Sequence, residues 1–215
     1  MPTAIEHSDL SGPVYARVKA MIEKGELKPG EKLVQEKLAN TLGVSRTPLL
    51  KALQQLEHEM LVESIPRRGM YVKSVSLQEM INVYDCREAV ETMAVRLLIE
   101  RASDKEKEKF ANIFESFDHN KIDPKKYGQA DEKFHDMLID LSKNPLLKKM
   151  SSLSNIHKQV YQYGLIRTPE QTLKEHLAIV DAVKQGDGSL AEREVRNHIN
   201  LSRNVLIELQ KQKNT

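Results

Sequence analysis

One aspartate and three histidines in the second half of the chain have the chemistry of metal ligands. Asp131 and His135 are four residues apart, so on a helix both side chains project from the same face. His176 and His198 follow in two later helical segments. Imidazoles combined with one carboxylate suit a divalent ion, zinc first, with nickel, iron or manganese as alternatives. Because the chain contains seven histidines, a surface or helix-capping role for each stays open from the residues alone.

A second group of residues has the chemistry of DNA contact. The segment that begins at Leu42 reads L-G-V-S-R-T-P-L-L-K-A-L-Q-Q-L-E. Gly43 ends one helical pattern, and Ser45 is placed to cap the next helix with its hydroxyl. The apolar stripe of that helix leaves three polar residues facing outward: Arg46, Thr47 and Lys51. A helix-turn-helix presents such residues to the major groove, although an ordinary antiparallel helix pair has the same pattern.

The flanking sequence predicts the remaining elements of a winged helix-turn-helix over residues 1–75. These are helices from Leu10 to near Gly25 and over Leu33–Leu42, and β-prone runs at Leu61–Ile65 and Met70–Lys73. A P-R-R-G turn separates the two β-prone runs and places Arg67, Arg68 and Gly69 at the tip of a hairpin. This hairpin would be the wing.

Capping signals predict an all-helical second domain. The capping boxes are Ser76 with Glu79, Ser103 with Glu106, Thr168 with Gln171, and Ser189 with Glu192. Two further helix starts combine an N-cap with a following proline, Asp123-Pro124 and Asn144-Pro145. The predicted helices cover residues 77–100, 104–119, 125–142, 145–164, 169–185 and 190–211. We therefore predict a mostly α fold, in which the winged helix-turn-helix is followed by an all-α six-helix bundle over residues 76–215.

Charge and cysteine content restrict the class of protein. The chain has 33 Lys and Arg against 31 Asp and Glu, a net charge of +2, which argues against a non-specific nucleic-acid coat. Cys86 is the only cysteine, so an intrachain disulfide is impossible and nothing indicates an oxidising compartment. The sequence shows neither the apolar core of a signal peptide nor an apolar run of membrane-spanning length. These features predict a cytoplasmic protein with no membrane partner.

The N-terminal residues resemble the DNA-binding domain of the GntR family of bacterial transcription regulators. The segments that carry the resemblance are G-E-L-K-P-G-E-K-L-V-Q-E-K-L-A-N-T-L-G-V-S-R-T-P (25–48), A-L-Q-Q-L-E (52–57) and P-R-R-G-M-Y-V (66–72). The resemblance implies that Arg46 and Thr47 reach base edges or adjacent phosphates. It also implies that Gly69 approaches the minor groove. In a winged helix, Arg67 and Arg68 would contact phosphates, and the alternative is that they lie in a solvated hairpin tip.

The recognition helix departs from the family's usual pattern at two positions. It usually begins S-R-T-P-V-R-E-A-L in this family and here reads S-R-T-P-L-L-K-A-L. Leu50 stands in place of an arginine, and Lys51 in place of a glutamate. Because Leu50 cannot donate to a phosphate or a base, one contact expected of the family is missing or is replaced by Lys51. The operator sequence is therefore open, but DNA binding is still expected.

The helical part resembles the FCD ligand-binding domain of the FadR subfamily, near its VanR-like group with six helices. The segments that carry the resemblance are D-E-K-F-H-D-M-L (131–138), S-K-N-P-L (142–146), E-H-L-A-I-V-D-A-V (175–183), G-D (186–187) and A-E-R-E-V-R-N-H-I (191–199). The resemblance implies that the metal ligands are Asp131, His135, His176 and His198. It also implies a small organic or sugar acid as effector, which would replace water on the metal.

A carboxylate effector needs a cation beside the metal, and the candidates are Arg87 and Arg167. The alternative role for Arg87 is an intrahelical ion pair with Glu91, four residues further on. The function implied is a ligand-responsive transcription regulator, not an enzyme, that binds a near-palindromic operator as a homodimer.

Two other functions are considered for the metal site. One is a metal-dependent hydrolase with Glu132 or Glu175 as base. Neither glutamate stands in a known catalytic spacing such as H-E-x-x-H, and this function leaves the N-terminal domain unexplained. The other is a metal sensor, in which the ion itself is the effector.

Overall fold

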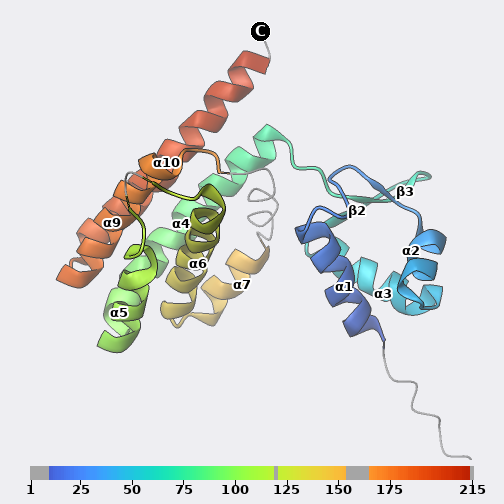
Figure 1. Ribbon diagram of the computed structural model, residues 1–215, viewed down its shortest axis with the longest axis horizontal. Helices are drawn as coiled ribbons and strands as arrows, with labels where there is room; N and C mark the ends of the chain where they lie inside the picture. The colour runs from blue at the N-terminus through green and yellow to red at the C-terminus, as the bar shows by residue number, and fades with distance from the viewer. Residues whose placement is uncertain (1–9, 119–120, 154–164, 214–215) are drawn as a thin grey trace, which may run out of the picture. The chain divides into compact units, whose positions relative to one another are not determined.

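The computed structural model describes residues 10–118, 121–153 and 165–213, and their contacts divide the chain into two compact units. The first unit ends at Val75 and the second begins at Ser76. The first contains helices and a small sheet, and the second is built from helices (Figure 1). The predicted fold class, a winged helix-turn-helix followed by an all-α domain, is confirmed. No helix of the described part is long and apolar enough to cross a membrane.

The N-terminal unit is a three-helix core with a three-stranded antiparallel sheet in the order β1-β3-β2. Its elements are α1 (Ser11–Glu23), β1 (Lys32–Leu33), α2 (Gln35–Leu42), α3 (Arg46–His58), β2 (Val62–Ile65) and β3 (Gly69–Val72). The apolar stripe of α3 and that of α1 meet in this core, where Ile22, Leu49 and Leu53 are completely buried. Burial of this stripe leaves the opposite face of α3 exposed.

The turn before α3 has the predicted glycine geometry but not the predicted capping bond. Gly43 has a φ of 66°, in the left-handed region that ends helices, and the Val44 N–H donates to Ala39 O over 3.1 Å. Ser45 is the N-cap residue of α3, as predicted, yet its hydroxyl makes no capping hydrogen bond. The second helix begins at Gln35, two residues later than predicted. Leu33 belongs to β1 instead, where it pairs with Met70 of β3. A two-residue strand leaves no periodicity to detect.

The C-terminal unit is organised around two long helices. Its elements are α4 (Leu77–Arg101), α5 (Asp104–Ala111), the 3₁₀ turn η1 (Asn112–Phe114), α6 (Pro124–Leu141), α7 (Pro145–Leu153), α9 (Pro169–Gln185) and α10 (Gly188–Lys213). In Figure 1, α4 and α10 lie side by side over much of their length. Arg196 of α10 bonds Glu88 of α4 over 2.8 Å, and Arg203 bonds Asp85 over 2.5 Å.

Most of the predicted helix starts are confirmed. Capping boxes begin α4, α5 and α9, and the side-chain oxygens of Asp123 and Asn144 accept N–H groups at the starts of α6 and α7. The prediction for the last helix was wrong, because Ser189 lies inside α10. Asp187 begins that helix instead, with its Oδ1 accepting from the Leu190 N–H over 2.9 Å.

The helix predicted over residues 104–119 was too long. It ends at Ala111 and continues as the 3₁₀ turn η1, which directs Phe114 into the core with 2% of its surface exposed. Residue 119 lies outside the described residues. So does the second half of the helix predicted over 145–164, of which α7 covers the beginning. Assignment to the six-helix group therefore stays a prediction.

The cap of α4 gives a first test of this fold. Ser76 Oγ accepts from the Glu79 N–H over 3.2 Å, and Glu79 Oε2 accepts from the Ser76 N–H over 2.9 Å. We expect Ser76→Ala to lower the free energy of unfolding of the C-terminal unit by about 1 kcal/mol, because one N–H of the first turn loses its acceptor. Urea unfolding followed by circular dichroism would measure this. Ser74→Ala changes a nearby exposed serine, and an equal loss there would contradict the capping contribution.

Candidate metal and effector site

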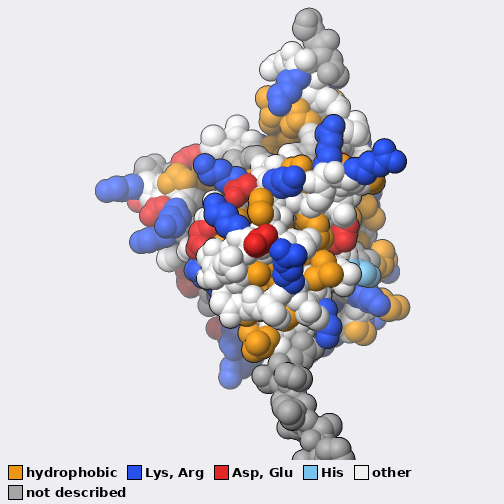
Figure 2. Space-filling model, turned by 90° about the vertical axis from the view of Figure 1, so that its right-hand side faces the viewer, with side chains coloured by type: hydrophobic (Ala, Val, Ile, Leu, Met, Phe, Trp, Pro, Cys, Tyr) orange, Lys and Arg blue, Asp and Glu red, His pale blue; other side chains and the backbone are white. Residues whose placement is uncertain are grey.

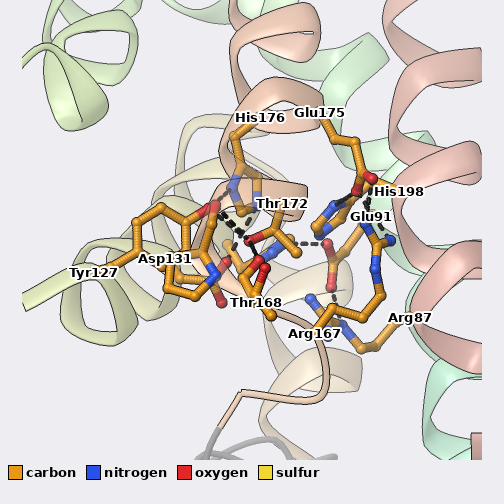
Figure 3. Close-up of polar contacts among 12 residues, drawn as sticks. Arg87, Glu91, Tyr127, Asp131, Arg167, Thr168, Thr172, Glu175, His176 and His198 are labelled. Atoms are coloured by element: carbon orange, nitrogen blue, oxygen red, sulfur yellow. Dashed lines mark hydrogen bonds and ion pairs between the residues drawn. The ribbon is translucent and has the colours of Figure 1, made fainter. Parts of the chain in front are cut away.

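Three histidines from three helices converge inside the C-terminal unit. His135 comes from α6, His176 from α9 and His198 from α10, and their side chains offer ligand atoms that all lie within 4.8 Å of one another. Each side chain is buried, and His176 has no exposed surface. Figure 3 shows His176 and His198 pointing toward one another, with polar residues of neighbouring helices around them. The structure thus brings together three of the four residues predicted as metal ligands.

Two of the three imidazoles are oriented by carboxylates. His135 Nδ1 lies 2.7 Å from Glu91 Oε2, and His198 Nδ1 lies 2.8 Å from Glu175 Oε2. Each glutamate also accepts from an arginine guanidinium, Glu91 from Arg87 and Glu175 from Arg167, which favours the ionised carboxylate. An ionised carboxylate can only accept, so each Nδ1 is assigned the proton and donates. This leaves the Nε2 lone pair of each ring available to a metal.

A chain of hydroxyl groups orients the third imidazole. Thr172 Oγ1 donates to Thr168 O over 3.2 Å, and a carbonyl oxygen can only accept. The Tyr127 hydroxyl lies 2.8 Å from Thr172 Oγ1, whose only proton is already donated, so Tyr127 donates to it. His176 Nδ1 lies 2.8 Å from the same Tyr127 oxygen and must therefore donate to it. Burial raises the pKa of Tyr127, which keeps this hydroxyl protonated.

The resulting arrangement fits a bound metal ion. With these hydrogen-bond directions, all three rings carry the proton on Nδ1 and have a lone pair on Nε2. Among the described residues, the buried Nε2 atoms of His135 and His176 make no hydrogen bond, although Asp131 Oδ1 lies 3.3 Å from that of His176. Burial lowers the pKa of His176 and of His198 well below the usual range, and the neighbouring imidazoles lower each further. Neutral imidazoles with buried, unsatisfied acceptors are the form in which histidine binds a metal.

The fourth predicted ligand, Asp131, lies at the edge of this cluster. It is buried, and its Oδ1 is 3.3 Å from His176 Nε2. Asp131 and His135 are on the same face of α6, as their spacing predicted. A carboxylate here would add a negative oxygen donor to the three nitrogen donors, a combination that divalent transition metals accept.

Both predicted effector-binding arginines line the same small cavity. Arg87 and Arg167 contribute to its wall with Asp131, His135 and His198. Its volume is about 20 Å³, which is room for a single water-sized group. The ion pair considered as the alternative role of Arg87 is present, because its Nε donates to Glu91 Oε1 over 2.7 Å. The cavity and the ion pair are compatible, since the same side chain takes part in both.

Arg167 is paired as well, with the glutamate that holds His198. Its Nη1 donates to Glu175 Oε2 over 3.1 Å and its Nη2 donates to Oε1. Burial raises the pKa of Glu175 to about 7, and the Arg167 guanidinium opposes this rise. Because Glu175 is engaged on both oxygens, it is poorly placed to act as the base of a hydrolase.

Three residues of this site were missed by sequence reasoning: Glu91 as a partner of a histidine, Tyr127, and Phe114. Phe114 stacks on His176 with ring centroids 4.7 Å apart and an interplanar angle of 8°. One signal was present for Tyr127, which precedes Asp131 by four residues and so occupies the same face of α6. No sequence signal connects Phe114 or Glu91 to the histidines, because the contacts join different helices.

The predicted DNA-contacting residues are exposed on the N-terminal unit. Arg46, Thr47 and Lys51 lie on the outer face of α3, with Leu50 among them at 42% exposure. Arg46 bonds Glu36 over 3.1 Å, but both side chains are about 70% exposed, so the pair is weak and can be exchanged for a phosphate. In Figure 2, Lys and Arg side chains project from the face shown, with acidic side chains between them.

The tip of the wing has strained backbone geometry. Arg67 has a φ of 64° and Gly69 a φ of 100°, and the Arg68 N–H donates to Ile65 O over 3.0 Å. A left-handed conformation is ordinary for glycine but costs an arginine about 1–2 kcal/mol. Met60 and Lys143 also have positive φ angles, so the geometry alone does not assign Arg67 a role.

Comparison with known proteins agrees with this geometry. A winged helix-turn-helix joined to a helical domain with a buried histidine cluster defines a class of DNA-binding regulator with an effector domain. Residues 10–72 match the bacterial regulatory proteins of the gntR family, and residues 82–201 match the FCD domain. The chain belongs to the GntR family and carries an FCD domain, and it is a DNA-binding transcription regulator, not an enzyme.

Similar chains are themselves transcription regulators. The chain is 32% identical over 192 residues to the HTH-type transcriptional regulator YdhC of Bacillus subtilis, covering 86% of each. It is 33% identical over 129 residues to the Nta operon transcriptional regulator of Aminobacter aminovorans, covering 59% of this chain and 61% of that one. A GntR transcriptional regulator structure from Rhodococcus sp. RHA1 has the same fold, with a TM-score of 0.76, 20% identity, and coverage of 94% of this chain and 99% of that one.

The lowered pKa of His176 predicts how the metal-free protein responds to pH. In the folded state this imidazole stays neutral, whereas in the unfolded chain it binds a proton below pH about 6.5. Its contribution to stability is therefore complete above pH about 6.5 and is lost as the pH falls. We expect the free energy of unfolding of wild type to fall more steeply than that of His176→Gln, by up to about 1.4 kcal/mol per pH unit.

Urea unfolding of both proteins between pH 7.5 and 5, in the presence of a chelator, would measure this difference. Groups that titrate in both proteins cancel when the two slopes are subtracted. His58→Gln changes an exposed histidine of the other unit and serves as the control. Parallel curves for wild type and His176→Gln would contradict a neutral buried imidazole.

Proposed function

We propose that this regulator binds a near-palindromic operator as a homodimer and that its FCD domain binds a divalent metal ion, zinc first, beside a small carboxylate effector. The observation that carries the proposal is the convergence of His135, His176 and His198 with their Nδ1 atoms engaged. Asp131 is the proposed fourth ligand, and Arg87 and Arg167 are the proposed cations for the effector. A bound ion would supply positive charge and open positions for a carboxylate oxygen.

The protein's own residues provide the orientation that such a site needs. Glu91, Glu175 and Tyr127 fix the ring directions, and Phe114 stacks on the face of the His176 ring. These contacts exclude water from the imidazoles and keep the nitrogen lone pairs directed inward. The size of the cavity means that an organic acid enters only when side chains along it move.

DNA recognition is proposed to use α3 and the wing. Arg46, Thr47 and Lys51 would face the major groove, while Arg67, Arg68 and Gly69 at the wing would contact phosphates and the minor groove. Leu50 offers an exposed apolar side chain among these polar residues. It suits contact with a thymine methyl group, which an arginine at this position would not favour.

Dimer formation is proposed to use the helical domain. This unit exposes large apolar side chains on its two longest helices, Met93 on α4 and Leu201 and Leu209 on α10. A second copy could cover such a surface, and a dimer would present two recognition helices to two half-sites one helical turn apart.

Selection of genomic DNA fragments by the purified protein tests the function as a whole. We expect enrichment of one two-fold symmetric site, because two identical recognition helices read it. Sedimentation of the protein with the recovered site would measure the number of chains bound. Recovery of no common sequence, or of a site bound by a single chain, would contradict the operator proposal. A selection that succeeds only with zinc, and needs no organic acid for release, would favour the metal-sensor alternative.

A variant at the wing tip separates DNA contact from folding. We expect Arg67→Gly to weaken operator binding and to lower the slope of log K against log salt by about 1, because one phosphate contact is lost. Folding stability should stay unchanged or rise by up to about 1 kcal/mol, since glycine relieves the left-handed strain.

Fluorescence anisotropy at several salt concentrations and urea unfolding would measure the two effects. Lys105→Ala removes an exposed cation of the other unit and should change neither. Loss of binding accompanied by loss of stability would mean that Arg67 has a structural role instead.

A further inference from the structure

Each cavity arginine is paired with a glutamate that also orients a histidine. On one side, Arg167 donates to both oxygens of Glu175, and Glu175 Oε2 accepts from His198 Nδ1 over 2.8 Å. We refer to these three residues as the Arg167 chain. Figure 3 shows Arg167, Glu175 and His198 in direct succession. Any group that takes Arg167 away from Glu175 therefore changes the environment of a proposed metal ligand.

The matching contacts on the other side form the Arg87 chain, Arg87–Glu91–His135. Arg87 and Glu91 lie one turn apart on α4, and their side chains are only 5% and 3% exposed. His135 Nδ1 completes this chain over 2.7 Å. Because both members of the ion pair are buried and one turn apart on the same helix, Glu91 has little room to change partners.

The Arg167 chain is built differently. Arg167 lies before the start of α9, in the segment of residues 165–168 that is not helical, and Leu165 and Ile166 beside it also line the cavity. Glu175 is 17% exposed, several times more than Glu91. The cavity reaches only about 20 Å³, so a carboxylate of more than a few atoms needs a side chain on this wall to move.

We propose that Arg167 is an exchangeable cation: it gives up its ion pair with Glu175 and forms one with the effector carboxylate. Glu175 is then the positioning residue that couples the affinity for the effector to the affinity for the metal. This inference rests on the proposed function and adds to it the route of coupling. While Arg167 is paired with Glu175, its guanidinium draws negative charge away from that carboxylate. After the exchange, a metal ion on His198 would keep Glu175 ionised. Glu175 would then accept more strongly from His198 Nδ1 and make the Nε2 lone pair a better donor to that metal.

The coupling between effector affinity and metal affinity is positive and reciprocal. A carboxylate that engages Arg167 strengthens the metal site, so it raises metal affinity, and metal must raise carboxylate affinity by the same factor. The Arg87 chain stays intact throughout and holds His135 in place. The two chains thus have different roles, one as a fixed support and one as the coupled element.

The test measures zinc affinity of the full-length protein by competition with a chromophoric chelator, in sodium acetate and in sodium chloride of equal ionic strength. Acetate is the smallest carboxylate probe. We expect acetate to tighten zinc binding by a factor of about 5 or more in wild type. In Glu175→Gln, zinc binding should weaken by about 10–100-fold, and the acetate effect should shrink to the part that acetate gains by binding the metal directly.

Two further variants serve as controls. Glu91→Gln should weaken zinc binding to a similar extent but keep the acetate effect, because the Arg87 chain does not exchange. Glu100→Gln changes an exposed glutamate near the end of α4 and should alter neither quantity. An acetate effect that is equal in wild type and Glu175→Gln would overturn the exchange, while the proposed effector site would stand. A wild-type protein that binds no zinc would overturn both.

A measurement on wild type keeps the inference testable if Glu175→Gln fails to fold. Nitrogen-15 spectra of the imidazole rings report each Nδ1–H separately. We expect acetate to shift the His198 Nδ1–H resonance of the zinc-loaded protein and to leave that of His135 in place. Equal shifts of both, or of neither, would overturn the assignment of Arg167 as the exchangeable cation.

Discussion

The helical domain depends on one constraint, which is that three buried imidazoles each need an acceptor for Nδ1–H while Nε2 stays open. A buried polar group without a partner is costly, so each ring requires a residue from another element. α4 supplies Glu91, α6 supplies Tyr127 and α9 supplies Glu175. These hydrogen bonds fix the positions of the helices around the histidine cluster. The ion pairs between α4 and α10 hold those two helices together.

The packing around these rings leaves only a small cavity at the site. Phe114 and Phe134 pack against His176 with ring centroids 4.7 Å away in each case, and aromatic walls of this kind exclude water. The cations that would recognise an acid are already paired with glutamates. We therefore propose that this protein recognises its effector by an exchange of partners among charges that are already paired, and not by filling an open pocket.

In the DNA-binding unit, by contrast, the residues proposed to contact DNA are exposed and the apolar residues form the core. α3 is held by Leu49, Leu53 and Leu56, which are completely buried, so its outer face can vary without loss of the fold. Position 50 on this outer face is an example, because it is leucine here and usually arginine in the GntR family. Arg67 of the wing likewise has a left-handed backbone conformation, which glycine would adopt at a lower energy cost.

The sequence by itself determined the fold class, the family, and most helix starts, because apolar periodicity and capping residues act within one turn of the chain. It also brought Asp131 and His135 to one helix face. Only the tertiary structure decided that Phe114 would leave a helix to reach His176, that Glu91 would face His135, and that Asp187, not Ser189, would begin α10. These outcomes depend on contacts between residues about 40 or more positions apart, or on the choice between competing caps. Local patterns do not encode such contacts, since packing and the satisfaction of buried polar groups decide them.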